Sequence, residues 1–94
     1  MDERLLNKRQ EILGIAARHG VRSIRVFGSC SRDDASPQSD VDFLVEAGEG
    51  RSAFFPGGLI ADLEDLLGQQ VDVVEPEGLH WSIKAQILAE AVPL

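Results

Sequence analysis

Apolar residues near the start of the chain recur at the spacing that places them on one face of a helix. They are Leu5, Leu6, Ile12, Leu13 and Ala16. This spacing predicts a helix over residues 2–19, which Gly20 is placed to end. The same periodicity returns in residues 59–67, before Gly68, and in residues 79–89. The pattern therefore predicts three helices, each with an apolar face.

Short apolar segments rich in β-branched residues lie between these helices and predict strands. They are residues 24–27, 40–45 and 71–74. Residues 28–39 are polar and contain Pro37, which forbids a continuous helix, although one or two helical turns can start at Ser29. When the helical turn at Ser29 is counted with the three helices, the expected order is α-β-α-β-α-β-α. This order predicts an α/β (α+β) fold class in which a three-stranded mixed sheet is flanked by helices.

Length and composition predict one folded domain over residues 1–94. Hydrophobic residues make up 44% of the chain and charged residues 27%, which is ordinary for a globular protein and argues against disorder. The net charge of −7 argues against direct binding to nucleic acid, which needs a basic surface. Seven of the nine basic residues lie at or before Arg32, and thirteen of the sixteen acidic residues follow it. The two halves are either solvated faces, or a cationic half facing an anionic substrate and an anionic half holding metal.

The cellular setting is predicted from what the sequence contains. Cys30 is the single cysteine, so an internal disulfide framework is impossible and a reducing compartment fits best. The first residues do not resemble a signal peptide, and no apolar run approaches the length of a membrane span. We therefore expect a cytoplasmic protein with no membrane partner.

Three aspartates carry the candidate chemistry. Asp40 and Asp42 are two residues apart on a predicted strand, so both point to the same face and repel each other unless a cation lies between them. Carboxylate oxygens of this kind suit magnesium or manganese. Asp72 lies within an otherwise apolar strand, where we expect it to be buried and paired or metal-bound. If that strand neighbours the strand of Asp40 and Asp42, the three carboxylates can hold two divalent ions for phosphoryl or nucleotidyl transfer.

The polar segment before the aspartate pair supplies candidate phosphate ligands. Gly28 ends a strand and allows close backbone approach, and Ser29 adds a hydroxyl beside exposed amides. Arg32 offers a charged fork for a triphosphate, or alternatively pairs with Asp33 or Asp34. Ser39, directly before the aspartate pair, completes the predicted nucleotide-binding set. No Gly-Lys-Ser/Thr follows the glycine, so this is not a Walker loop.

In combination, these residues resemble a known family. A Gly-Ser pair at Gly28 and Ser29, ten further residues, Asp-x-Asp at Asp40 and Asp42, and a later Asp72 resemble the DNA polymerase beta-like nucleotidyltransferase superfamily. The short chain looks most like its minimal nucleotidyltransferases. The resemblance implies that the three aspartates are catalytic and bind two Mg²⁺ ions, and that the Gly-Ser turn holds the phosphates of ATP.

The resemblance also implies a biological role. Many minimal members are antitoxins of a helical HEPN-domain ribonuclease toxin, and some attach adenylate to a toxin tyrosine. The main hypothesis is therefore a Mg²⁺-dependent enzyme that transfers AMP, or another nucleoside monophosphate, from a triphosphate to a hydroxyl of such a toxin, in a hetero-oligomer. The alternative is an antitoxin that acts by binding alone, because Asp33 stands where the family commonly has glycine. Transfer to a small molecule or an RNA end is disfavoured by the acidic composition.

Overall fold

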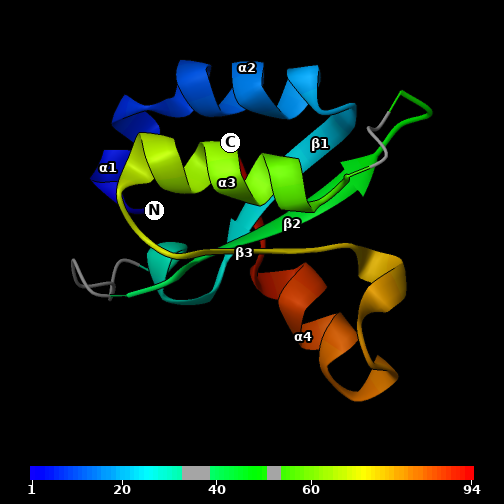
Figure 1. Ribbon diagram of the computed structural model, residues 1–94. Coiled ribbons are helices and arrows are strands. Elements are labelled where there is room, and N and C mark those ends of the chain that lie inside the picture. The colour runs from blue at the N-terminus through cyan, green and yellow to red at the C-terminus, as the bar shows by residue number, and fades with distance from the viewer. Residues whose placement is uncertain (33–38, 51–53) are drawn as a thin grey trace.

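Two helices cover one face of a mixed sheet, and a third helix lies on the opposite side (Figure 1). The computed structural model describes residues 1–32, 39–50 and 54–94. Helices α2 (Arg9–Arg18) and α3 (Gly57–Leu67) lie side by side over the sheet. Helix α4 (Trp81–Glu90) projects from the other side and buries none of its residues fully. No helix in the described part of the chain has the length and apolar character needed to cross a membrane.

The sheet has four strands in the order β3-β2-β1-β4. β1 (Val21–Phe27) is antiparallel to β2 (Val41–Ala47), and β3 (Val71–Val74) is parallel to β2. The predicted mixed sheet is therefore confirmed, but the prediction of three strands was wrong. The fourth strand, β4 (Val92–Pro93), pairs antiparallel with the end of β1. Two residues are too few to show an alternating pattern, and one of them is a proline, so the sequence carried no strand signal there.

The remaining differences lie at the ends of elements. The first predicted helix is divided in two, α1 (Glu3–Asn7) and α2, because the backbone leaves helical geometry at Lys8. β1 begins at Val21, since pairing with β2 extends it beyond its apolar stretch. The helical turn predicted near Ser29 is the short 3-10 helix η1 (Gly28–Cys30). A second such turn, η2 (Pro76–Gly78), precedes α4.

The core lies between the sheet and helices α2 and α3. Val41, Phe43 and Val45 of β2 are fully buried and belong to the same cluster as Leu59 and Leu63 of α3. Leu44, which shares the face of Asp42, is fully buried as well, outside that cluster. Because successive strand residues point to opposite faces, Asp42 points to the face that α2 and α3 leave open. The hydrophobic pattern of β2 thus determines the side of the sheet on which the Asp42 carboxylate lies.

Candidate active site

The candidate site lies where β1 ends and where β2 and β3 begin. β1 is antiparallel to β2, so Phe27 at the end of β1 is opposite Asp42 near the start of β2. β3 is parallel to β2, and Asp72 is the residue opposite Asp42. The topology therefore brings the Gly-Ser turn and two of the three predicted aspartates, Asp42 and Asp72, together at the same end of the neighbouring strands β1, β2 and β3. The condition set by the sequence, that the strand of Asp72 neighbours that of Asp42, is therefore met.

Gly28 lies directly against the Asp42 carboxylate. Its φ of +73° is in the left-handed region that favours glycine. A Cβ atom at this position would lie 2.5 Å from Oδ2 of Asp42, so the turn or the carboxylate would have to shift to admit one. Both the backbone conformation and the carboxylate beside it thus favour glycine here. Ser29 follows within η1, in the turn whose first residue lies against Asp42.

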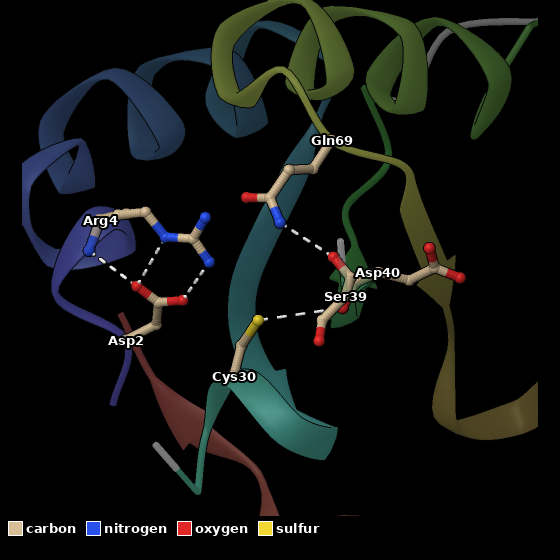
Figure 2. Close-up of polar contacts among 6 residues, drawn as sticks. All are labelled: Asp2, Arg4, Cys30, Ser39, Asp40 and Gln69. Atoms are coloured by element: carbon tan, nitrogen blue, oxygen red, sulfur yellow. Dashed lines mark hydrogen bonds and ion pairs between the residues drawn. The ribbon is translucent and has the colours of Figure 1, made fainter. Parts of the chain in front are cut away.

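The turn after β1 contacts the N-terminal segment and contains a buried thiol. The Asp2 amide donates to the Cys30 carbonyl at 2.9 Å, and the Asp2 carboxylate caps α1 while pairing with Arg4. Cys30 is buried, its Sγ lies 3.9 Å from the Asp40 carbonyl, and burial raises the pKa of the thiol (Figure 2). The thiol therefore packs between η1 and the start of β2.

The start of β2 is tied to the segment that precedes β3. Gln69 Nε2 donates to the Ser39 carbonyl at 2.9 Å, and the Val41 amide donates to the Gln70 carbonyl at 2.9 Å. Figure 2 shows the Asp40 carboxylate directed away from Cys30, on the side of the chain opposite the buried thiol. These contacts fix the backbone on which Asp40 is carried. The role of Ser39 in nucleotide binding stays a prediction.

Asp42 is in a strongly acidic environment. Burial raises the pKa of its carboxyl, and the charges of Asp72, Asp40 and Glu90 raise that pKa further. The mutual repulsion predicted from the sequence is thus present, with a fourth acid that the sequence did not indicate. One prediction was wrong: Asp72 is exposed and not buried, because the open face of the sheet leaves the side chain at this position in solvent.

A divalent cation fits this site in donor type and charge. Asp40, Asp42 and Asp72 offer the hard oxygen ligands that Mg²⁺ prefers, and a cation would offset the repulsion that raises the Asp42 pKa. The side chains are not already gathered around one point: within residues 1–32, 39–50 and 54–94, no three His, Cys, Asp or Glu side chains are close enough to hold an ion. Metal binding by the three aspartates stays a prediction.

Glu90 is the residue that sequence reasoning missed. Its carboxylate accepts a hydrogen bond from the Gly28 amide at 2.8 Å and forms an ion pair with the Arg32 guanidinium. Asp33 and Asp34, the ion-pair partners that the sequence predicts for Arg32 as an alternative to nucleotide, both lie outside the described residues. No local pattern marks Glu90, since it reaches the turn from 62 residues further along the chain. Whether Arg32 also binds nucleotide stays a prediction.

The raised pKa of Asp42 predicts a specific dependence of stability on pH. Because the folded-state pKa lies above the unfolded value of about 3.9, the folded state binds this proton more tightly, and stability falls as pH rises through that window. Without metal, Asp42→Asn is therefore expected to be more stable than wild type at neutral pH, by under ~1 kcal/mol. Urea unfolding at several pH values checks this. An advantage that does not shrink in acid would contradict it.

Known proteins with similar sequences define the class. A family model described as a nucleotidyltransferase domain matches residues 8–94. Protein adenylyltransferase MntA of Thermococcus cleftensis is 44% identical over 75 residues, which cover 80% of this chain and 76% of the relative. A Methanocaldococcus jannaschii protein provisionally named a protein adenylyltransferase is 40% identical over 84 residues, covering 89% and 90%. The chain therefore belongs to the nucleotidyltransferase family, and the prediction of a nucleotidyltransferase enzyme is confirmed.

Solved structures agree with the fold. A structure provisionally described as a minimal nucleotidyltransferase superposes with a TM-score of 0.85 at 44% identity, covering 100% of this chain and 97% of that one. A toxin–antitoxin crystal structure with AMP-PNP has a TM-score of 0.75 at 21% identity, covering 89% of this chain and 69% of that one. An MntA-HepT toxin–antitoxin structure has a TM-score of 0.68 at 18% identity, covering 94% and 69%. The last two support the fold alone.

Proposed function

We propose that this chain transfers a nucleoside monophosphate, most simply AMP from ATP, to a hydroxyl of a partner toxin and thereby acts as its antitoxin. The observation that carries the proposal is the packing of the Gly28 turn on the Asp42 carboxylate, with Asp72 next to it in register. Nucleotidyl transfer requires a turn that binds the phosphates and paired carboxylates that bind metal, and here the two lie together at one end of the strands. The family membership of the chain supports the same chemistry.

The proposed reaction is an in-line displacement at the α-phosphorus of the nucleotide. The acceptor oxygen forms a bond to phosphorus while the bond from phosphorus to the α,β-bridging oxygen breaks, and pyrophosphate leaves with that oxygen. The acceptor hydroxyl loses its proton, for which the exposed Asp72 carboxylate is the candidate base. The Ser29 backbone amide and hydroxyl, in the turn that Gly28 opens, hold the β and γ phosphates.

Magnesium is part of the proposal. Asp40, Asp42 and Asp72 would hold the ions, which supply charge neutralisation of the phosphates and activation of the attacking oxygen. The arrangement of the carboxylates supports this assignment through their repulsion at Asp42. A metal that stabilises the folded chain raises its melting temperature by mass action. We expect Mg²⁺ with an ATP analogue to raise it for wild type and not for Asp42→Asn.

The nature of the partner is proposed from relatives and neighbours. The relative from Thermococcus cleftensis is named a protein adenylyltransferase, and two structural neighbours are toxin–antitoxin complexes. The resemblance seen in the sequence adds that the partner is a helical HEPN-domain ribonuclease and that the acceptor is a tyrosine hydroxyl. Such a partner would be a small helical protein, encoded beside this chain, that carries Arg-x-x-x-x-His.

Labelled ATP tests the transfer and its chemistry together. The purified chain is mixed with its candidate partner, Mg²⁺ and ATP labelled either on the α or on the γ phosphate, and other triphosphates are run in parallel. We expect the α label on the partner and the γ label released in pyrophosphate. Transfer of the γ label instead would make the chain a kinase, and no transfer with any nucleotide or metal would contradict the proposal.

Neutralisation by contact alone is the second candidate function, because Asp33 departs from the glycine common at this position. Asp33 lies outside the described residues, so the sequence departure is what favours this candidate. The two functions separate in cells that express the toxin. If the Asp40→Ala and Asp42→Ala variants bind the toxin but no longer protect growth, transfer is required. Full protection by both variants would favour contact alone.

A further inference from the structure

The Glu90 carboxylate bridges the two ends of the Gly-Ser turn. Gly28 opens η1 and Arg32 follows it, and the same Glu90 oxygen, Oε1, receives the Gly28 amide and the Arg32 guanidinium. Ser29 lies between these two contacts. One side chain, from a helix far along the sequence, thus contacts both the start of the turn and the side chain of Arg32 beyond its end.

The backbone next to Glu90 is held in place by strand pairing. Glu90 is the last residue of α4, and only Ala91 separates it from β4. Val92 and Pro93 of β4 pair with Val26 and Arg25 of β1, the strand that leads into Gly28. The carboxylate and the turn it holds are therefore anchored to the same strand. The Glu90 side chain is only 18% exposed, so it has little freedom to move away.

We propose that Glu90 is a positioning residue that clamps the Gly28–Arg32 turn in the shape that receives the nucleotide phosphates. The inference rests on the proposed function and deepens it, because it assigns a role to a residue outside the motif. The clamp matters because Gly28 is in contact with Asp42, so a turn that loosens shifts the phosphate ligands and the carboxylate against each other. Arg32 balances the negative charge that Glu90 brings to an already acidic edge.

The same contacts also fit a second interpretation, in which Glu90 competes with nucleotide instead of supporting its binding. Glu90 is an anion bound to an amide and a guanidinium, so it could instead occupy the place of a phosphate and have to leave before nucleotide binds. Its low exposure and its anchoring through β4 favour the clamp. The two arrangements predict opposite changes in nucleotide affinity when the carboxylate is removed.

The test compares three variants in nucleotide binding. Glu90→Gln keeps an oxygen for the Gly28 amide but loses the charge that pairs with Arg32, and Glu90→Ala loses both contacts. Glu77→Gln removes the same charge from an exposed residue of η2 and serves as the control. Calorimetric titration with AMP-PNP and Mg²⁺, well below the unfolding temperature of each variant, should rank wild type and control first, then Gln, then Ala. The loss in Glu90→Ala should be about tenfold.

A double-mutant cycle and amide exchange complete the design. If Glu90 acts through Arg32, the affinity losses of Glu90→Gln and Arg32→Gln should be less than additive. The Gly28 amide should exchange with solvent more slowly in wild type than in Glu90→Ala, with or without nucleotide. Unchanged or tighter binding of AMP-PNP by Glu90→Ala would overturn the clamp. If wild type binds no nucleotide, the proposed function fails, and equal Gly28 exchange in both proteins would then overturn the clamp separately.

Discussion

Replacing Asp42 with asparagine is expected to abolish nucleotide transfer while the chain still folds. The substitution keeps the size of the side chain but removes the charge that would bind a divalent cation, so we expect the transfer rate to fall by at least ~10³-fold. Folding should survive because the change relieves repulsion from Asp40, Asp72 and Glu90. Transfer of label from ATP to the partner measures the first effect, and thermal unfolding measures the second.

A matched control separates the site from the surface. Asp65→Asn makes the same chemical change at an exposed residue of α3, a helix that lies on the opposite face of the sheet, and should retain the wild-type rate. An Asp42→Asn variant that fails to fold would show that the carboxylate is structural. A folded variant that transfers nucleotide at the wild-type rate would remove Asp42 from the chemistry.

Gly28→Ala is expected to disable the site by a different route. The alanine Cβ would stand 2.5 Å from Asp42 Oδ2, and the φ of +73° is strained for any residue with a side chain. The turn or the carboxylate must therefore move. We expect the free energy of unfolding to fall by ~1–3 kcal/mol and transfer to fall about 10²-fold, since small displacements of reacting groups are costly. Urea unfolding and the label-transfer assay measure the two effects.

Two other glycines separate the causes of that effect. Gly68 ends α3 with a φ of +66°, and no atom of the described residues lies within 4 Å of its missing Cβ, so Gly68→Ala shows the cost of backbone strain alone. Gly14 is exposed within α2 and equally unobstructed, so Gly14→Ala should stabilise the chain by up to ~1 kcal/mol. Both variants should retain activity. A Gly28→Ala variant with full activity would contradict the close packing of the turn on Asp42.

The sequence predicted those parts of the site that depend on local periodicity. The alternation of apolar residues in β2 placed Asp42 on one face of the strand, and the structure confirms its packing, with Val41, Phe43 and Val45 buried. Adjacency of Asp72 was conditional on strand pairing, and the parallel register of β2 with β3 supplies it. Motif spacing and alternation therefore sufficed for the family and for the face of β2 on which Asp42 lies.

The parts that were missed depend on tertiary structure. Asp72 is exposed although Val71 and Val73 beside it are buried, which an apolar segment cannot reveal in isolation. Strand β4 exists because β1 offers a free edge to a two-residue segment. The same pairing delivers Glu90 to the Gly28 amide, so a contact across 62 residues had no counterpart in any local pattern.

The central claim is that the carboxylates at the start of β2 and β3 transfer a nucleotide to a partner protein. The most direct test is the intact mass of the candidate toxin after incubation with this chain, ATP and Mg²⁺. With wild type, the toxin should gain the mass of one or more adenylyl groups. With Asp42→Asn, or with metal chelated, its mass should stay unchanged. An unmodified toxin in the wild-type reaction, while the two proteins form a stable complex, would contradict the claim.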